Sequence, residues 1–539
     1  MYWITHAAAL WLVFSAAAYS AEPAKSIPFS EFSKRADQLL RSQTGTQWGQ
    51  HSFSIASESK TLYSWEADKK AKPASNLKLL TTILSFELLG EDYPFQTGIA
   101  FEDTGERFRV YLRGQGDPSL SDSFLTPNGR KNYSNEFLDL LTQKISQKIQ
   151  NPAKPIELIL DDSSFSGTPL GPWPNQYLVK CYSAGVGAFN FGLNCDDVTL
   201  HPPATAGKSP SFSERWAPDY FEIKDETNWK KKGRRPSWEG ELLSASTFEA
   251  VSIQREMDGQ ISSVLPLWSE LVNLSRPAAD SKEIVFSGDG LPVGGKPALF
   301  RVSVSSMTEY FAKLLKARLE QKGFTVARWQ PAAFPAQAGA ESISLTDLKS
   351  NVYMMNKLSV NHIAESLFRA FSLKQSGHST YDASREIAKN KLAEKLEISD
   401  QDFYYADGSG LSHDNRVTSQ LLVKALQFAL QRPWWATLEE SLPIGGVDGS
   451  LGGRMQSGCY LQGRYYSDPK ACGLKGNVRA KTGYIGKVIT LTGTMKNFQG
   501  KRILFSLLTN DFQDLYSNRN HIRSFIHEQV LAELYRTEL

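Results

Sequence analysis

Three short motifs follow one another along the chain, and their residue types suit a serine acyl-transfer site whose base is a lysine. The motifs are Ser75-Asn-Leu-Lys78, Ser359-Val-Asn361 and Lys481-Thr482-Gly483. A hydroxyl becomes a useful nucleophile when an adjacent base takes its proton, and a neutral lysine amine can act as that base. Each motif alone also fits a helix cap, a solvated lysine or a strand turn. Their occurrence in this order favours a catalytic site.

The segment around Ser75 predicts a helix that begins at the nucleophile. Alternating apolar and polar residues at 51–57 and 61–65 predict a hairpin, and the apolar run 77–89 predicts a buried helix. Lys78 then lies one helical turn after Ser75, beside its hydroxyl. The N-terminus of this helix would direct backbone N–H groups toward an oxyanion formed at Ser75.

To act as a base, Lys78 must be neutral, so its pKa must fall from about 10.4 to roughly 7–8. Burial and a second cation both have that effect, and Lys481 is the candidate cation. A strand expected at 478–484 would supply the N–H of Tyr484 as a second oxyanion donor. Gly483 would let the acyl group approach this strand closely.

The second motif comes directly before an amphipathic run at 363–371. The hydroxyl of Ser359 is suited to pass a proton from the base to a leaving amine, and the amide of Asn361 is suited to hold a substrate backbone. A helix cap is the competing interpretation of this motif.

Beyond these motifs, the chain resembles a known family, the D-alanyl-D-alanine carboxypeptidase/endopeptidases of the penicillin-binding protein 4 type, peptidase family S13. The likeness extends over nearly the whole mature chain. The segments that carry it are Pro73–Thr81, Arg113–Leu120, Trp173, Tyr182–Ala184, Ala188–Phe191 with Asn194, Asp407–Ser412 with Asn415, and Leu442–Leu451. A likeness spread over so many segments indicates a shared fold and chemistry.

The resemblance implies a role for each matched residue. Ser75 would be the nucleophile, Lys78 the general base and Ser359 the proton relay. The substrate-binding residues would be Asn361, Lys481, Thr482, Gly483 and Tyr484, with Lys481 and Thr482 at the terminal carboxylate and the N–H groups of Ser75 and Tyr484 at the oxyanion.

The chain departs from the family's pattern at Val360, inside the second motif, and at His362, directly after it. Val360 stands where relatives often carry an acidic residue, and we expect this difference to affect local packing or substrate preference more than activity. His362 follows Asn361 directly. A lone histidine at such a position is more often packed or solvated than catalytic.

The resemblance also implies an α+β fold with a serine β-lactamase/transpeptidase-like core, in which helices flank an antiparallel sheet beside a helical subdomain. The first two motifs lie about 280 residues apart, so roughly 200 residues form a large mixed α/β insertion between them. We expect a signal peptide at 1–20, a peptidase domain built from 21–97 and 335–539, and one or more inserted domains at 98–334. Residues 98–105 and 330–342 are the candidate linkers.

The four cysteines form two close pairs, Cys181 with Cys195 and Cys459 with Cys472. Three pairings are possible, but the two local ones close loops of about 14 residues, each worth on the order of 3 kcal/mol in an oxidising compartment. We predict both local disulfides. Neither pair has the spacing of a zinc site, and we expect no metal and no cofactor.

The N-terminal segment resembles a cleaved signal peptide. Its apolar run of about 12 residues is short of the ~20 needed to span a bilayer, and the small residues Ala18, Ser20 and Ala21 follow it. Cleavage near Ser20 or Ala21 would release the protein into the periplasm or cell-envelope space. The first six residues hold no Lys or Arg, which leaves an uncleaved anchor as the alternative.

Charge excludes few partners. The chain has 60 Lys and Arg against 57 Asp and Glu, and a net charge of +3 does not indicate nucleic-acid binding. The basic run 230–235 is expected to be a solvated loop. The apolar stripe along 521–535 fits core packing better than a membrane surface, because its polar face is not strongly basic. We expect no stable transmembrane anchor.

These observations predict an exported serine hydrolase that acts on the D-Ala-D-Ala ends of peptidoglycan stem peptides, with DD-endopeptidase activity on cross-links as a further expectation. β-Lactam antibiotics would acylate Ser75 and act as covalent inhibitors. A catalytically silent peptidoglycan-binding or scaffolding protein is one alternative, against which the complete set of motif residues counts. A β-lactamase is another, against which the large insertion counts.

Overall fold

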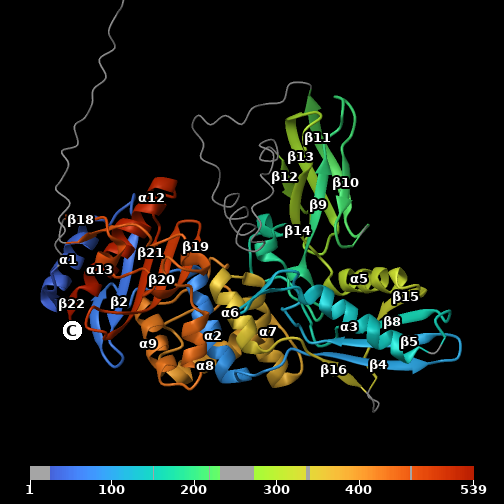
Figure 1. Ribbon diagram of the computed structural model, residues 1–539, viewed down its shortest axis with the longest axis horizontal. Helices are drawn as coiled ribbons and strands as arrows, with labels where there is room; N and C mark the ends of the chain where they lie inside the picture. Colours follow the sequence, from blue (N-terminus) through green and yellow to red (C-terminus); the bar gives the residue numbers. More distant parts are fainter. Residues whose placement is uncertain (1–24, 150, 218, 231–271, 336–339, 462–463) are drawn as a thin grey trace, which may run out of the picture.

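The computed structural model describes residues 25–149, 151–217, 219–230, 272–335, 340–461 and 464–539. The predicted signal peptide and all of the basic run except Lys230 lie outside the described residues. The chain forms an elongated molecule in which a sheet with its helices, a helical region and a second sheet region follow one another along the long axis (Figure 1). A narrow β-arm rises beside the second sheet.

The first region is built on a five-stranded antiparallel sheet of order β19-β20-β21-β2-β3. Its strands are β2 (Gln50–Ala56), β3 (Thr61–Trp65), β19 (Arg479–Ile485), β20 (Val488–Lys496) and β21 (Arg502–Asn510). The predicted hairpin before Ser75 is β2 with β3. Because β3 and β19 are the edge strands, the third motif lies on an edge of the sheet.

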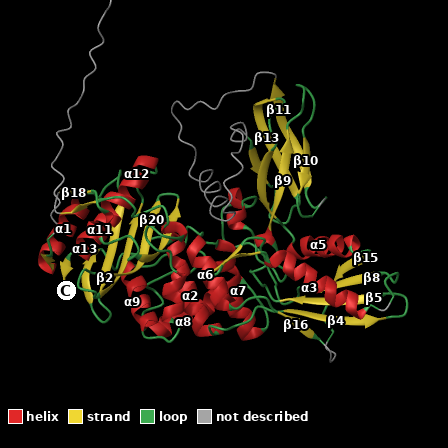
Figure 2. Cartoon of the chain, viewed as in Figure 1, coloured by secondary structure: helices red, strands yellow, loops and turns green. Residues whose placement is uncertain are grey.

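Terminal helices cover one face of this sheet (Figure 2). They are α1 (Phe29–Ser42), α12 (Tyr516–His521), the π-helical turn Ile522–His527 and α13 (Glu528–Tyr535). The apolar stripe predicted at 521–535 is buried against the sheet at Ile522, Ile526, Val530, Leu531 and Leu534, whereas Phe525 is exposed. Core packing of this stripe is therefore confirmed.

The helical region packs around α2 (Leu77–Leu89), whose residues from Leu77 to Phe86 are all buried. Its other helices are α6 (Leu348–Leu358), α7 (Asn361–Ser376), α8 (Tyr381–Leu396), α9 (Ser419–Leu430) and α10 (Trp435–Ser441). They share one hydrophobic core with α2. The predicted buried helix after Ser75 is confirmed, and a short 3-10 turn, Ala74–Asn76, precedes it.

The second sheet has the order β15-β8-β5-β4-β16. Its strands are β4 (Thr97–Asp103), β5 (Phe108–Gly114), β8 (Ile156–Asp161), β15 (Val326–Pro331) and β16 (Glu341–Ile343), with α3 (Tyr133–Lys148) and α5 (Met307–Gln321) packed on it. The strands β5, β8 and β15 run parallel, whereas β4 and β16 are antiparallel to their neighbours. The mixed character expected of the insertion is confirmed.

The linker expected at 98–105 was wrong, because most of this stretch is strand β4. It pairs with β5 on one side and β16 on the other, and Ile99 is fully buried between them. Glycines at both ends of the stretch suggested a linker, but tertiary pairing decides the structure. The domain division itself stays a prediction.

The β-arm consists of two three-stranded sheets, β10-β9-β14 and β11-β13-β12. Its strands are β9 (Cys195–His201), β10 (Ser211–Glu214), β11 (Glu222–Lys230), β12 (Asn273–Ser275), β13 (Glu283–Pro292) and β14 (Ala298–Ser303). Phe286 packs against Phe212 and Phe300 between the two sheets.

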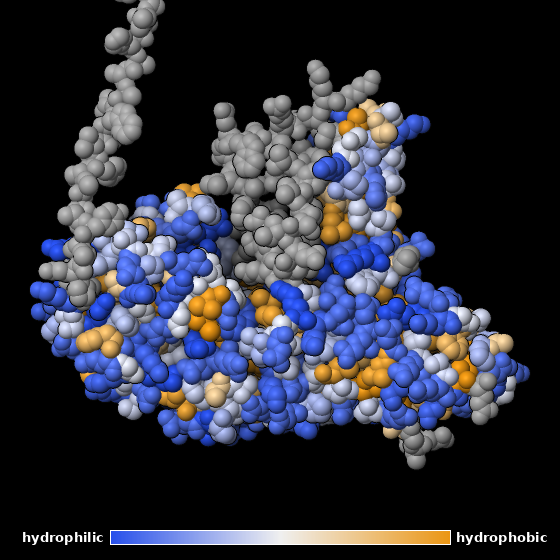
Figure 3. Space-filling model, viewed as in Figure 1, coloured by the Kyte–Doolittle hydropathy of each residue, from blue (hydrophilic) through white to orange (hydrophobic). Residues whose placement is uncertain are grey.

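Both predicted disulfides, Cys181–Cys195 and Cys459–Cys472, are present. The second one joins β17 (Cys459–Leu461) to α11 (Pro469–Cys472). The visible face of the molecule is predominantly hydrophilic, and its apolar side chains gather only in small patches (Figure 3). Within the described residues, no helix is both long and apolar enough to cross a membrane.

Candidate active site

The first two motifs meet at Lys78, which is fully buried. Its Nζ lies 2.9 Å from Ser75 Oγ, 2.7 Å from Asn361 Oδ1 and 2.8 Å from the carbonyl oxygen of Ser409. Ser75 stands in the 3-10 turn before α2 and is only partly buried. The helix therefore holds the amine inside the protein while the hydroxyl stays within reach of a substrate.

Burial is the main cause that shifts the pKa of Lys78, and it lowers this pKa to about 7. Two carboxyl groups, those of Glu365 and Asp407, act in the opposite direction and raise it. The sequence had suggested two means, burial and a second cation at Lys481, and desolvation in the helical core accounts for the shift. A near-neutral pKa suits a general base at physiological pH.

The third motif meets the second at a buried lysine. Lys481 Nζ donates to Ser359 Oγ at 2.9 Å and to the carbonyl of Thr482 at 3.0 Å. Thr482 Oγ1 lies 2.6 Å from the hydroxyl of Ser450, a residue that the motif analysis had not singled out. Hydroxyls and a buried cation therefore converge on one side of the site, where a carboxylate can be bound.

Two non-glycine residues beside the motifs have left-handed backbones. Ser359 (φ 60°) ends α6 and turns the chain into α7, and Ala74 (φ 45°) immediately precedes Ser75. Such conformations cost of order 1–3 kcal/mol for a non-glycine residue and persist where surrounding structure over-determines them. Both turns aim a serine hydroxyl into the site.

The edge strand β19 presents alternate backbone N–H groups away from its partner β20. The N–H of Ala480 points outward, because it donates to the carbonyl of Pro443 at 3.0 Å. Strand geometry repeats every two residues, so the N–H of Tyr484 is directed to the same side. The Tyr484 side chain itself points to Asp514, with its hydroxyl 3.0 Å from Oδ2.

Gly483 sits where a side chain would collide with the first motif. A Cβ at this position would lie 2.1 Å from Thr490 Oγ1 and 3.0 Å from the backbone nitrogen of Ser75. We expect Gly483→Ala to slow acylation by about 100-fold, because it displaces the strand or the nucleophile by a fraction of an ångström or more. Labelling with a fluorescent penicillin measures the rate.

Gly453→Ala is the matched control for that substitution, since a Cβ at Gly453 has open space around it. It should label at the wild-type rate. Wild-type labelling by Gly483→Ala would contradict the close approach of β19 to Ser75.

The insertion contributes directly to the site. Asn361 Nδ2 donates to the carbonyl of Tyr182 at 2.8 Å, and Trp173 Nε1 donates to Asp407 Oδ2 at 3.0 Å. Trp173, Tyr177 and Tyr182 also pack against an apolar cluster that includes Ala74. The amide of Asn361 is thereby oriented with its oxygen toward Lys78 and its nitrogen toward the insertion.

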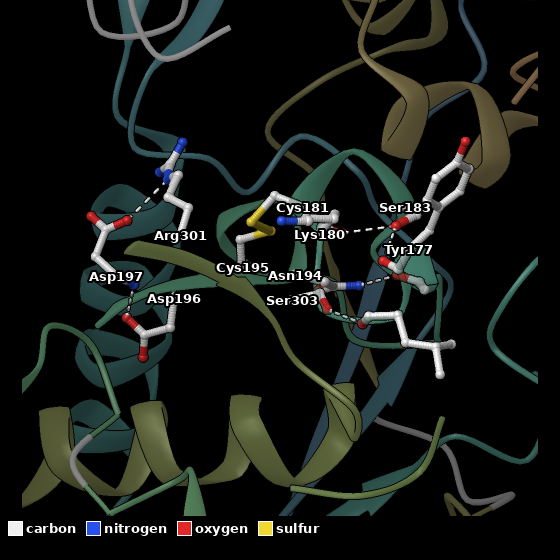
Figure 4. Close-up of a disulfide and its surroundings, with 12 residues drawn as sticks. Tyr177, Lys180, Cys181, Ser183, Asn194, Cys195, Asp196, Asp197, Arg301 and Ser303 are labelled. Carbon is white, nitrogen blue, oxygen red and sulfur yellow. Dashed lines mark hydrogen bonds and ion pairs between the residues drawn. A yellow bond between two sulfur atoms is a disulfide. The ribbon is translucent and has the colours of Figure 1, made fainter. Parts of the chain in front are cut away.

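A disulfide and hydrogen bonds hold the loop of residues 177–183 (Figure 4). This loop includes Tyr182. The Cys181–Cys195 disulfide ties it to β9, and Ser183 Oγ donates to the carbonyls of Tyr177 and Lys180 at 2.5 and 2.9 Å. Ser303 Oγ donates to the carbonyl of Leu178 at 2.6 Å. The disulfide therefore stabilises a loop that contacts a motif residue.

Replacing Cys181 and Cys195 together by serine should lower the acylation rate about tenfold, because the Tyr182 carbonyl is then held less firmly against Asn361. The matched control replaces Cys459 and Cys472, whose disulfide lies in a different part of the chain. Both double variants should lose about 2–4 kcal/mol of stability in denaturant titrations. Equal acylation rates in the two would contradict the positioning role of this loop.

Several groups at the site were not predicted from the sequence. The carbonyl of Ser409 and the side chain of Asp407 belong to a segment that had been noted only as a family signature. Glu365, fully buried on α7, gave no signal except its spacing of one turn from Asn361. Backbone carbonyls and single buried carboxyls have no recognisable pattern in a sequence.

Val360 and His362, the two departures from the family's pattern, are packed residues. Val360 lies in the helical core. His362 is buried, and its burial lowers its pKa to about 3, so the ring is neutral at physiological pH. The interpretation of His362 as a packed residue is confirmed.

Fold and site together define a hydrolase with a serine β-lactamase/transpeptidase-like core, as predicted. A model of the D-Ala-D-Ala carboxypeptidase 3 (S13) family matches residues 36–238 and 268–529, and the chain belongs to this family. It is a serine-type D-Ala-D-Ala carboxypeptidase.

Two curated relatives have the same activity in their names. The chain is 26% identical over 470 residues to a D-alanyl-D-alanine carboxypeptidase of Actinomadura sp. (strain R39), with 83% of this chain and 75% of the relative covered. It is 25% identical over 476 residues to the D-alanyl-D-alanine carboxypeptidase DacB of Haemophilus influenzae, with 86% of each chain covered.

A solved structure confirms the fold. The crystal structure of penicillin-binding protein 4 (dacB) from Haemophilus influenzae superposes with a TM-score of 0.68 at 21% identity, covering 92% of this chain and 97% of that one. A second structure of that protein, in complex with a novel β-lactam, superposes with a TM-score of 0.65 at 20% identity and covers 93% and 98% of the two chains.

Proposed function

We propose that this carboxypeptidase acts through an acyl-enzyme on Ser75, with Lys78 as the general base. The observation that carries the proposal is the 2.9 Å contact between Lys78 Nζ and Ser75 Oγ. When the Lys78 amine is neutral, its two N–H groups would donate to Asn361 Oδ1 and the Ser409 carbonyl. The lone pair would then face the Ser75 hydroxyl.

In the first step, Ser75 Oγ bonds to the carbonyl carbon of the penultimate D-alanine, and the hydroxyl proton passes to Lys78. The N–H groups of Ser75 and Tyr484 stabilise the resulting oxyanion. Collapse breaks the amide C–N bond, and the leaving D-alanine nitrogen takes a proton that Ser359 relays. Water then hydrolyses the ester and frees Ser75.

The other motif residues bind the substrate in this proposal. Lys481 and Thr482, with the Ser450 hydroxyl beside them, hold the terminal carboxylate, since a charge-assisted hydrogen bond favours an anion there. Asn361 holds the substrate backbone. Gly483 keeps β19 close enough for its edge to bind the acyl group.

The substrates proposed are stem peptides of peptidoglycan that end in D-Ala-D-Ala, and β-lactams are proposed to acylate Ser75. The names of the curated relatives and the β-lactam complex of the Haemophilus influenzae protein support both proposals. A cross-link between stem peptides presents the same D-alanyl carbonyl with a different amine. DD-endopeptidase activity is therefore part of the proposal.

An exported protein is proposed as well. Two disulfides are typical of an oxidising compartment such as the periplasm. The division into a peptidase domain (21–97 and 335–539) and an insertion (98–334) is proposed on the same footing. The separate sheets of the two regions support it, except that β16, within 335–539, pairs with β4 of the insertion sheet.

Release of D-alanine from a diacetylated tripeptide ending in Lys-D-Ala-D-Ala tests the function, with a cross-linked muropeptide dimer as second substrate. Release from the tripeptide supports the acyl-enzyme carboxypeptidase, and cleavage of the dimer supports endopeptidase activity. If the protein neither releases D-alanine nor is labelled by penicillin, the result would favour a scaffolding protein. Fast penicillin turnover without D-alanine release would favour a β-lactamase.

A further inference from the structure

The carboxyl group of Glu365 occupies a buried position behind the site. Glu365 lies one turn after Asn361 on α7 and is fully buried. Its Oε1 accepts from the backbone N–H of Ser409 at 2.8 Å, and its Oε2 accepts from that of Gly408 at 3.1 Å. Both carboxyl oxygens are thus committed to one backbone turn, residues 407–410.

That turn also makes two contacts to α2. The carbonyl of Ser409 accepts from Lys78 Nζ at 2.8 Å, and the carbonyl of Gly408 accepts from Thr81 Oγ1 at 2.5 Å. Asp407 stabilises the turn internally, because its Oδ1 accepts from the Gly410 N–H at 2.8 Å. The turn is therefore clamped between α7 and α2, and one of its carbonyls is the third partner of the Lys78 amine.

We propose that Glu365 is a positioning residue for Lys78: it holds the 407–410 turn so that the Ser409 carbonyl directs the amine toward Ser75. The inference rests on the proposed role of Lys78 as general base. Asn361 and the Ser409 carbonyl then fix two of the three directions of the amine. A shift of this carbonyl would rotate the lone pair away from the Ser75 hydroxyl.

Titratable groups face Glu365 from each neighbouring element. They are Lys78 on α2, Asp407 on the clamped turn, Arg369 on α7 itself, Tyr381 on α8 and Tyr405 just before the turn. Burial, the largest cause, and Asp407 raise the pKa of Glu365 to about 8, although the turn's hydrogen bonds and Lys78 lower it. Glu365 is therefore mostly neutral near pH 7, and its replacement by glutamine changes the geometry of the turn more than the charge beside Lys78.

The test is the profile of acylation rate against the concentration of fluorescent penicillin for wild type and Glu365→Gln. The glutamine keeps the size of the side chain but can accept from only one of the two N–H groups. We expect the rate at which bound penicillin acylates Ser75 to fall about 10- to 100-fold, with the affinity for unreacted penicillin unchanged. An unchanged profile would overturn the inference, and so would a loss confined to the affinity for penicillin, which indicates a purely structural carboxyl.

A matched control and a second variant complete the test. Glu157→Gln removes another fully buried glutamate, which pairs with Arg109 on the insertion sheet, and should keep the wild-type profile. If Glu365→Gln does not fold, Thr81→Val removes the other clamp on the turn. A slower rate in Thr81→Val supports the inference, and a wild-type rate overturns it.

The inference and the proposed function fail in different ways. Absence of wild-type labelling contradicts the acyl-enzyme itself. Wild-type labelling with an unaltered Glu365→Gln profile contradicts only the positioning role.

Discussion

Ser75→Ala should abolish both D-alanine release and penicillin labelling, with a loss of more than about 10³-fold in rate. The substitution removes the one side-chain oxygen of the first motif that contacts Lys78 Nζ. The backbone of the 3-10 turn and the buried helix α2 do not depend on that oxygen, so the fold should be retained. D-alanine release from the tripeptide substrate measures the effect, and circular dichroism verifies the fold.

Ser85→Ala is the matched control on the same helix. Ser85 is buried, and its hydroxyl donates at 2.7 Å to the carbonyl of Thr81 within α2. This variant should keep near-wild-type activity. Substantial D-alanine release by Ser75→Ala would show that another group is the nucleophile.

Lys78→Met should lower the acylation rate about 10²- to 10⁴-fold, the usual contribution of a positioned general base. Methionine fills the same buried volume without a proton-accepting group. It also leaves Asn361 Oδ1 and the Ser409 carbonyl without their shared donor. Second-order acylation rates with penicillin measure the loss.

The assignment of Lys78 as general base determines how the acylation rate changes with pH. Burial lowers the pKa of Lys78 to about 7, and only the neutral amine accepts the Ser75 proton. The wild-type acylation rate should therefore rise as the pH increases through about 7, and Lys78→Met should lose this limb. A wild-type rate that is flat from pH 5 to 9 would contradict Lys78 as the base.

Lys357→Met serves as the control for removing a buried lysine. Lys357 donates to the carbonyl of Leu442 and to Asp448, each at 2.7 Å, and not to Ser75. We expect lower thermal stability in this variant, because Asp448 loses its ion-pair partner. The midpoint of the acid limb should stay in place.

Local sequence patterns predicted the parts of the site that depend on a short stretch of chain. An uninterrupted apolar run predicted the buried helix after Ser75, and the spacing of Ser75 and Lys78 predicted their contact. The two short cysteine spacings predicted both disulfides. Each of these features follows from residues within about 15 positions of one another.

Features that depend on contacts between distant parts of the chain were not predicted from the sequence. Strand β4 was interpreted as a linker, because its glycines are visible in the sequence and its partners β5 and β16 are not. Burial and a second cation at Lys481 were both expected as causes of the lowered pKa of Lys78, and only the packing of the helices around α2 shows that burial is the main cause. The contacts of Glu365 are to backbone N–H groups, which every residue except proline carries.

Peptide mass mapping of the wild-type protein after reaction with benzylpenicillin tests the central claim most directly. The acyl-enzyme account predicts one covalent adduct, on the peptide that contains Ser75, at a rate that rises through about pH 7. An adduct on a different residue, or D-alanine release by a protein that forms no adduct at Ser75, would contradict it.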